Sequence, residues 1–410
     1  MLNIDNILIT LSTLVIISYL FNLIAKRIKI PSVILLLATG IGLRLLGDQV
    51  GLQINNQAFF LNLFGVVGLI MIVLEGSLEL EITRKKLPAV GKSILSSVLI
   101  LAGTCGLIYL ILHLYLGMPI HNSIIYSIPL AIISSAIAIP SVKDLSTHKK
   151  EFIVYESTFS DIIGIMIFDF VILDNAFSAD SCKTFLLNLL YIILISFIGS
   201  AFLVFMLNRI KSHIKSFLIF AILILTYSIG KLFHLPSLLL ILTFGVMLNN
   251  NKFFVKGRLA TLLHLEEMTL VTTELKLLTA ETAFLIRTFF FILFGYTMDI
   301  KSIILPEVVI TGTAIIVCVL FARYIFLRFI SKVNVIPELF IAPRGLVTVV
   351  LLYSIPAHFI SPQFNNGILD YVIIVSSLIM MLGLMFTKSE FLESNSVIVE
   401  ETNAEVITPS

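Results

Sequence analysis

Long apolar runs separated by short polar connections make up most of the chain. An α-helix rises about 1.5 Å per residue, so about 20 apolar residues cross a hydrocarbon core of about 30 Å. This spacing predicts about thirteen membrane-spanning helices. They are expected at residues 6–25, 31–47, 59–78, 93–113, 122–141, 152–173, 185–207, 214–231, 235–250, 283–299, 306–328, 336–356 and 368–388.

One segment between the ninth and tenth predicted spans has a different pattern. Residues 256–281 mix leucines with Glu266, Glu267, Glu274 and Lys276. This mixture favours an amphipathic helix that lies in the membrane interface. A fourteenth crossing is the alternative.

The composition agrees with an all-α membrane protein over residues 1–390. Hydrophobic residues make up 58% of the chain and charged residues 13%, with a mean hydropathy of +1.08. Soluble domains are nearer 45–50% apolar and about 25% charged. No basic patch with interleaved aromatic residues is present, so nucleic acid is not an expected partner. Cys105, Cys182 and Cys318 are widely spaced and form no CxxC pattern, which indicates neither a metal site nor a disulfide framework.

Positive charges alternate between the connections. Lys26 and Arg27 follow the first predicted span, Arg323 and Arg328 close the eleventh, and the connections after even-numbered spans hold few such residues. Because positively charged connections stay in the cytoplasm, the pattern predicts a multi-pass protein of the cell (inner or plasma) membrane with its N-terminus outside. Residues 391–410 are polar and contain no Lys or Arg, so we expect a short disordered cytoplasmic tail.

Two parts of the chain resemble each other. Span two reads KIPSVILLLATGIGLRLL and span nine reads HLPSLLLILTFGVMLNN, with Gly40 and Gly245 at matching offsets. The following spans end in MIVLEGSLEL at 71–80 and FILFGYTMDI at 291–300. The partners are seven spans apart, and an odd offset reverses the orientation in the membrane. Inverted repeats of this kind are typical of secondary transporters.

The same offset pairs span five with span twelve. Span five ends AIISSAIAIPSVKD, with Pro140 near its end, and span twelve contains Pro343, Arg344 and Gly345. Proline lacks an N–H and glycine is flexible, so we expect the helices to break at these points. Broken backbone at mid-membrane occurs where it is packed in protein or lines a cavity, and paired broken helices form the substrate site in transporters built from repeats.

Asp161 lies about nine residues into the sixth predicted span, close to the bilayer centre. An ionisable group at that depth costs at least about 2.5–3.5 kcal/mol on insertion scales, so it normally faces a partner or water. With no obvious cationic partner, it holds a proton more readily than a carboxylate in water. Competition between H⁺ and Na⁺ or K⁺ for this one group is sufficient for exchange. Ser160, Ser134 and Ser135 are candidate neutral oxygen ligands.

Glu156 lies on the same predicted helix. Glu156 shares a helix face with Ser160, which lies four residues further along the chain. Asp161 lies about 140° away from Glu156 around the helix axis. Arg344 is its predicted partner, because an arginine inside the membrane needs an acid. We interpret this pair as a clamp between two helices rather than as part of the transport site.

Several of these stretches resemble one family. YESTFSDIIGIMIFDF is similar to the sixth-span motif of NhaP-type monovalent cation:proton antiporters, in which a Glu-Ser pair precedes Asn-Asp. IPSVILLLATGIGL, FFFILFGYTMDI and APRGLVTVVLL resemble other spans of that superfamily, and the resemblance covers residues 6–388.

The resemblance implies a homodimer in which a core of spans 4–6 and 11–13 moves against a dimerisation part of spans 1–3 and 8–10. It also implies an ion bound where broken spans five and twelve cross, with Asp161 as the essential ligand. The Glu–Arg pair that braces spans six and twelve in the family matches Glu156 and Arg344.

The chain departs from the family pattern at two places. Ser160 stands where electroneutral members have Asn and electrogenic members have Asp, and a serine adds no charge, which favours one-for-one exchange. Span five reads SSAIAIPS instead of containing Thr-Asp-Pro, and so is nearer the Kef-type pattern. One possible cation ligand is therefore missing.

These observations favour a secondary active antiporter without a cofactor that exchanges Na⁺ or K⁺ for protons. The alternative is an organic-anion transporter in which Arg344 binds a substrate carboxylate, which requires Arg344 to be free of Glu156. An intramembrane enzyme would need a nucleophile–base pair or a motif such as GxGD or HExxH, and neither pattern is present. A channel is disfavoured because the chain has no repeated filter-like loop.

Overall fold

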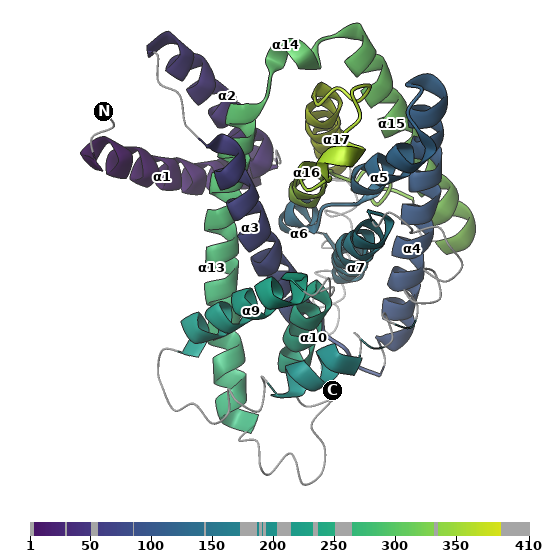
Figure 1. The fold of residues 1–410 in the computed structure, drawn as a ribbon. Coiled ribbons are helices and arrows are strands. Elements are labelled where there is room, and N and C mark those ends of the chain that lie inside the picture. The colour runs from purple at the N-terminus through teal and green to yellow at the C-terminus, as the bar shows by residue number, and fades with distance from the viewer. Residues whose placement is uncertain are drawn as a thin grey trace, which may run out of the picture.

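The computed structural model describes most of the chain as helices joined by short connections (Figure 1). The described residues are 4–28, 31–50, 56–84, 86–142, 145–172, 187, 191, 194–202, 215–232, 237–250, 265–331 and 335–386. Among them, seven helices are long and apolar enough to cross a membrane, judged by length and composition. Three shorter apolar helices accompany these seven. Most of the seventh predicted span and the predicted tail lie outside the described residues.

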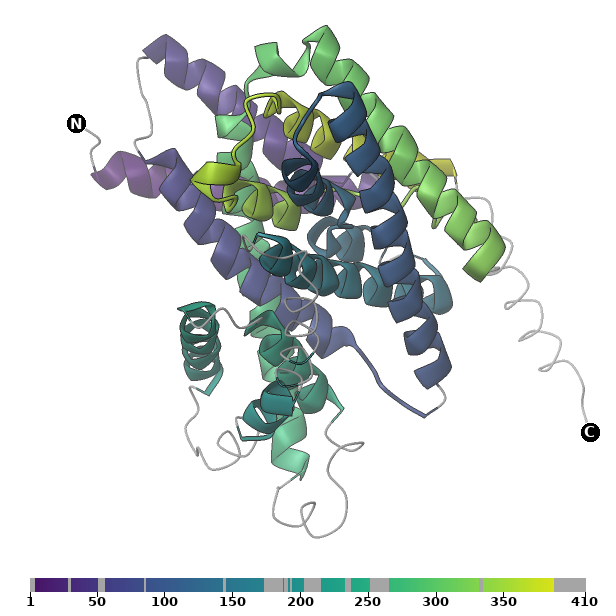
Figure 2. The same ribbon diagram turned by 45° about the vertical axis from the view of Figure 1, so that its right-hand side comes forward.

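Six helices pack into one group, which we call the scaffold group. They are α1 (Ile4–Ile28), α2 (Ser32–Val50), α3 (Gln57–Glu79), α9 (Lys215–Leu232), α10 (Ser237–Asn249) and α13 (Leu265–Thr297). In this group α13 lies against both α2 and α3, and α3 lies against α10 (Figures 1 and 2).

Close backbone contacts join the scaffold helices. A Cβ added at Gly40 of α2 would lie 2.1 Å from the carbonyl oxygen of Ile292, and one at Gly295 of α13 would lie 2.4 Å from that of Leu37. A Cβ at Gly245 of α10 would lie 1.8 Å from Ser77 Oγ on α3. Glycine at these positions therefore allows the helices to approach each other closely.

The other helices form a second group, which we call the crossing group. They are α4 (Leu87–Leu110, continued by a π-helix at Ile111–Tyr115), α5 (Ile120–Ala131), α6 (Ser135–Ser141), α7 (Thr147–Val171), α15 (Pro306–Ile325), α16 (Leu346–Tyr353) and α17 (Gly367–Phe386). The short helix α14 (Ile300–Ile303) connects α13 to α15. In this group α7 and α5 pack on α4, and α15 packs on both α4 and α17.

The segment predicted as an interfacial helix forms a different structure. From Leu265 onward it is part of α13, one continuous helix of 33 residues that also contains the tenth predicted span. No proline interrupts residues 265–297, so the amphipathic turns and the apolar turns continue as one helix about 50 Å long. The prediction of a separate interfacial helix was wrong for these residues, and residues 256–264 lie outside the described ranges.

Both spans predicted to be broken contain non-helical backbone, between α5 and α6 in span five and before α16 in span twelve, where residues 336–340 form turns. The break expected at Pro343–Gly345 is present, because residues 341–345 are non-helical and α16 begins at Leu346. In span five the break lies at a different position from the one predicted near Pro140. Residues 132–134 form the break, whereas Pro140 lies inside α6. The two breaks touch where the backbone N–H of Ser134 donates to the carbonyl oxygen of Pro343 at 2.9 Å.

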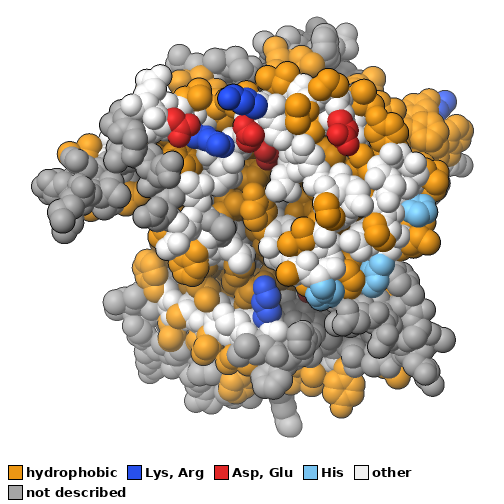
Figure 3. All heavy atoms as spheres, turned by 45° about the horizontal axis from the view of Figure 1, so that its top comes forward, with side chains coloured by type: hydrophobic (Ala, Val, Ile, Leu, Met, Phe, Trp, Pro, Cys, Tyr) orange, Lys and Arg blue, Asp and Glu red, His pale blue; other side chains and the backbone are white. Residues whose placement is uncertain are grey.

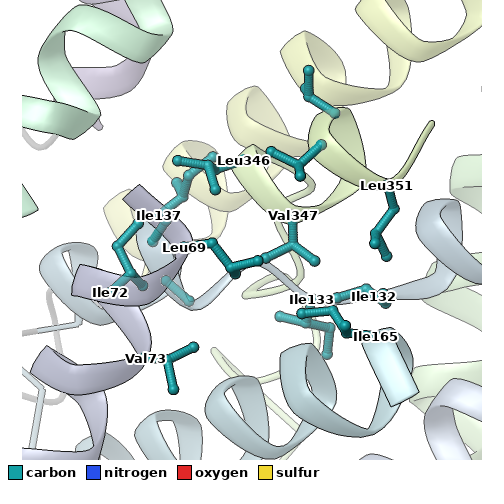
Figure 4. Packing of buried hydrophobic residues seen from close by; sticks show 14 of the residues in the cluster. Leu69, Ile72, Val73, Ile132, Ile133, Ile137, Ile165, Leu346, Val347 and Leu351 are labelled. Atoms are coloured by element: carbon teal, nitrogen blue, oxygen red, sulfur yellow. The ribbon is translucent and has the colours of Figure 1, made fainter. Parts of the chain in front are cut away.

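Helix α3 packs against this crossing and joins the two groups. Close-approach glycines on α3 contribute, since a Cβ at Gly65 would lie 2.5 Å from Val350 and one at Gly68 would lie 3.0 Å from Leu346. Figure 4 shows the buried side chains of α3 and α7 around those of the crossing. They are Leu69, Ile72 and Val73 of α3, Ile165 of α7, and Ile132, Ile133, Ile137, Leu346, Val347 and Leu351 of the crossing.

The surface is unusually apolar. Large hydrophobic side chains such as Leu114, Phe329 and Ile304 are 66–73% exposed. Figure 3 shows hydrophobic side chains spread over one face, with most of its acidic and basic side chains in the upper part of the view and one Lys or Arg side chain lower, near the centre. Such an apolar exterior suits a lipid environment, because a soluble protein would bury this area from water.

Candidate functional site

Asp161 lies in the interior beside the break between α5 and α6. The residue is 1% exposed, although it carries a carboxylate. Its Oδ2 accepts a hydrogen bond from the backbone N–H of Ser135 at 3.1 Å and another from the Ser135 hydroxyl. Its Oδ1 has no hydrogen-bond partner among the described residues. One oxygen is therefore held in place, and the other is available to a proton or a cation.

The three serines predicted as ligands are all at the crossing. Ser134, Ser135 and Ser160 are at most 2% exposed. The hydroxyl oxygen of Ser160 accepts the backbone N–H of Ile133 at 3.1 Å. The hydroxyl of Ser134 has no partner in the described part of the chain. The structure thus brings these serines into the region of Asp161, while their role as ion ligands stays a prediction.

The break in span five is stabilised by tertiary contacts. Three consecutive N–H groups, those of Ile133, Ser134 and Ser135, bond to Ser160, Pro343 and Asp161 instead of to a preceding turn of helix. Buried N–H groups must be paired, so these partners replace the missing helical bonds. Close packing of Gly345 against this segment also holds the break in place. A Cβ on Gly345 would lie 2.6 Å from Ile137 and 2.7 Å from Ser134 Oγ.

The ion pair predicted between Glu156 and Arg344 is wrong. Glu156 instead pairs with Arg323 of α15, whose two terminal nitrogens donate to the two carboxylate oxygens at 2.7 and 2.8 Å. Both side chains are about 1% exposed. This two-bond geometry is the strongest arrangement available to a guanidinium and a carboxylate, and it satisfies Glu156 completely.

Arg344 binds main-chain oxygens. Its Nε and one terminal nitrogen donate to the carbonyls of Leu130 and Ala131 at 2.9 and 3.1 Å, and the other terminal nitrogen donates to Ala342 at 2.7 Å. The last carbonyls of a helix have no partner within the helix. Arg344 therefore caps the C-terminal end of α5, which explains why it does not need Glu156.

The sequence interpretation missed two buried residues beside Glu156. Arg323 had been counted among the cytoplasmic charges that close span eleven, but it is fully buried. The signal for this was its position several residues inside an apolar run, the same signal that singled out Arg344. Glu338 is also fully buried, and its backbone carbonyl accepts the Nε–H of Arg323 at 2.6 Å.

A second ion pair lies within the scaffold group, and its arginine also bonds to the crossing group. Arg287 of α13 lies 3.5 Å from Glu75 of α3, and it also donates to the carbonyl of Ala136 in α6 at 3.2 Å. Both charged side chains are nearly buried, at 10% and 12% exposure. The scaffold group thus holds the start of α6 through a charged hydrogen bond.

The site contains oxygen donors and lacks the usual ligands of a transition metal. Among the described residues no group of three or more His, Cys, Asp or Glu side chains could hold a metal ion. One carboxylate with hydroxyl oxygens in the same region matches the preference of hard cations such as Na⁺ and K⁺.

Comparisons with known proteins identify the family and agree with the fold. Residues 11–388 match the model of a family described as "Sodium/hydrogen exchanger, transmembrane". Two structures of the sodium proton antiporter MjNhaP1 from Methanocaldococcus jannaschii are similar to this chain. The first, at pH 8, has a TM-score of 0.69 at 18% identity, and the match covers 92% of this chain and 97% of the antiporter chain. The second has a TM-score of 0.66 at 16% identity, and the match covers 96% of this chain and 97% of the antiporter chain. No curated protein matches the chain.

Proposed function

Because the chain belongs to the sodium/hydrogen exchanger family, whose members are membrane transporters and not enzymes, we propose that Asp161 is its shared site for H⁺ and a monovalent cation. The cation is Na⁺ or K⁺. The observation that carries this proposal is the half-satisfied carboxylate at the crossing of two broken helices. Ser135 holds its Oδ2, and Oδ1 has no partner among the described residues.

Exchange follows from charge balance at this one carboxylate. A buried carboxylate without a counter-charge is costly, so Asp161 is neutralised by either a proton or a cation. If only the neutralised carrier reorients, each cation moved one way is exchanged for a proton moved the other way. Ser160 adds no further charge, which supports one-for-one exchange. Ser134, Ser135 and Ser160 are proposed to supply neutral oxygens.

Alternating access is proposed to occur between the two groups of helices. The crossing group corresponds to the ion-carrying core of spans 4–6 and 11–13, and the scaffold group to the dimerisation part of spans 1–3 and 8–10. Packing supports this division, because most helix contacts lie within each group, and α3 and α13 contact both. By its family resemblance the chain is proposed to form a homodimer.

The proposed architecture is thirteen spans in two inverted repeats. Packing of the matched segments supports the repeat. Gly40 of span two lies against span ten, and its counterpart Gly245 of span nine lies against span three. Spans three and ten are themselves the next matched pair, so the contact and its repeat-related counterpart both occur. Such reciprocal packing is expected when two repeats are related by a two-fold axis.

The remaining parts of the proposal concern location. The distribution of Lys and Arg supports a cell-membrane protein with its N-terminus outside and its C-terminus in the cytoplasm. The proposed mechanism uses only the transported ions and requires no cofactor.

The organic-anion alternative is less well supported. Arg344 is free of Glu156, as that hypothesis requires, but all three of its nitrogens donate to backbone carbonyls. A substrate carboxylate would have to displace bonds that cap α5. No observation therefore favours Arg344 as a substrate ligand.

The test is exchange by purified protein in proteoliposomes, measured as dissipation of a pH gradient on addition of Na⁺ or K⁺. Asp161→Asn should abolish exchange of both ions while the protein still folds. Asp169→Asn changes an exposed carboxylate on the same helix and should retain wild-type exchange. Undiminished exchange by Asp161→Asn would show that another group carries the ion.

A further inference from the structure

Glu338 is a buried acid without a polar partner for its side chain. It belongs to the turn at residues 336–340 that precedes the break in span twelve. The residue is 0% exposed, and neither Oε1 nor Oε2 has a hydrogen-bond partner among the described residues. An ionised carboxylate in that state would lose its hydration without compensation, which is among the most costly arrangements in a protein interior.

The guanidinium that bonds to the backbone of Glu338 is already paired with another acid. Arg323 of α15 bonds to both oxygens of Glu156 on α7, so these two residues form a neutral pair. Arg323 also reaches Glu338, but through the backbone carbonyl and not through the carboxyl group. In this conformation an ionised Glu338 would therefore have no hydrogen bond from Arg323 to its carboxylate.

Lys149 is the other charged group that faces this region. It comes from the first turn of α7, and its ammonium donates to the backbone carbonyl of Ile336 at 3.2 Å. Ile336 is 55% exposed. Glu338 therefore lies two residues along the chain from an exposed position at the predicted cytoplasmic end, the side from which we expect its proton to exchange.

We propose that Glu338 is a second proton-binding site, protonated in this conformation, which controls the Glu156–Arg323 pair. When Glu338 loses its proton, its carboxylate competes with Glu156 for the guanidinium of Arg323. Glu156 and Asp161 are five residues apart on α7, so a change in the pair alters the helix that carries the ion site. The regulatory part of this inference rests on the proposed exchange function, whereas the protonation itself does not.

The second site is distinct from the first. The described partner of Asp161 is Ser135 of α6, and the groups around Glu338 are on α7 and α15. The two acids have no hydrogen-bond partner in common in the described part of the chain. They can therefore be titrated and mutated separately.

Infrared difference spectroscopy tests the protonation directly. The full-length protein is reconstituted in lipid and titrated from about pH 5 to pH 9 in two backgrounds, Asp161→Asn and Asp161→Asn with Glu338→Gln. The first should show a protonated carboxylic-acid band that the second lacks and that disappears as the pH rises. If the two spectra are equal at every pH, the proposal is overturned. This readout does not require transport, so it remains decisive even if the chain exchanges no cation.

Transport measurements test the regulatory part. Inside-out membrane vesicles expose the cytoplasmic side, and exchange is measured while pH is varied on that side only. Glu338→Gln mimics the protonated state and should shift the pH profile of the rate by about one pH unit or abolish its dependence on cytoplasmic pH. The concentration of cation for half-maximal rate at the optimal pH should be unchanged.

Two further variants distinguish a pH-sensing role of Glu338 from a purely structural one. Glu307→Gln changes an exposed acid at the opposite end of α15 and should have the wild-type profile. Glu338→Asp keeps a titratable group and should retain a dependence on cytoplasmic pH, which a purely structural role would not predict. A Glu338→Gln profile that coincides with the wild-type profile would overturn the regulatory role.

Discussion

Removing one member of the pair formed by Glu156 and Arg323 should strongly destabilise the crossing group. The pair joins α7 to α15 through two hydrogen bonds of 2.7 and 2.8 Å between side chains that are about 1% exposed. Removing one partner of a buried ion pair costs about 3–5 kcal/mol, because the other charge is left uncompensated. A pair this completely buried belongs in that range and not in the range of about 0–1 kcal/mol typical of surface pairs.

The two single substitutions should lower the free energy of unfolding by different amounts. Arg323→Met removes both bonds to Glu156 and also the bond to the carbonyl of Glu338, so we expect a loss of about 5 kcal/mol. Glu156→Gln leaves an amide oxygen that still accepts from Arg323, so about 3 kcal/mol is expected. The double variant Glu156→Met with Arg323→Met removes both charges of the pair and should lie within about 2 kcal/mol of the wild type.

The assay is reversible unfolding of the purified protein in mixed micelles, with the free energy of unfolding extrapolated to zero denaturant. Arg328→Met, an exposed arginine a short distance along the chain, is the matched control and should change stability by less than about 0.5 kcal/mol. The reasoning is refuted if both single variants lose less than about 1 kcal/mol. It is also refuted if the double variant loses as much as the two singles together.

Two other predictions concern packing and surface charge. Gly40→Ala places a Cβ 2.1 Å from a backbone oxygen of α13 and should sharply lower the yield of folded protein in size-exclusion chromatography, whereas Gly42→Ala, with nothing within 4 Å, should not. The ammonium of Lys86 bonds to Glu81 at 2.8 Å and to Glu151 at 2.7 Å. The hydrogen bond and charge of Lys86 lower the pKa of Glu81, and the bonds to Glu151 and Glu81 raise the pKa of Lys86. The stabilisation is therefore fully present from above the ordinary carboxyl pKa to below the ordinary lysine pKa. It is lost as the pH falls through the lowered pKa of Glu81 or rises through the raised pKa of Lys86. Lys86→Met should cost up to about 1 kcal/mol at pH 7 and nothing below about pH 3, measured by the same unfolding assay. An equal loss at both pH values would contradict the assignment.

Features with a local cause were predictable from the sequence. Apolar runs of sufficient length became helices, because a helix satisfies its backbone bonds within the segment. The interruption of span twelve was predictable for the same kind of reason, since Pro343 and Gly345 act on their own turn of backbone. The presence of Asp161 in a buried helix followed from its position in an apolar run.

Features that depend on distant partners were not predictable. The break at residues 132–134 has no proline or glycine, and the N–H groups there bond to Ser160, Pro343 and Asp161. Similarly, depth along a span did not show whether Arg323 or Arg344 meets Glu156, because both arginines lie inside apolar runs. The orientation of α7 relative to α15 decides the pairing, and a single sequence does not contain that angle.

The positions of the two buried arginines fit the exchange role proposed for Asp161. Arg323 is bound to Glu156, and Arg344 is bound to carbonyls at the end of α5. Asp161 is therefore left with neutral donors from Ser135 as its described partners. Neutral donors orient a carboxylate but do not cancel its charge, so a mobile ion must do so. A fixed guanidinium at Oδ1 would cancel it permanently and block exchange. In the proposed mechanism, the capping role of Arg344, which keeps a buried permanent charge engaged elsewhere, therefore matters for transport as well as for folding.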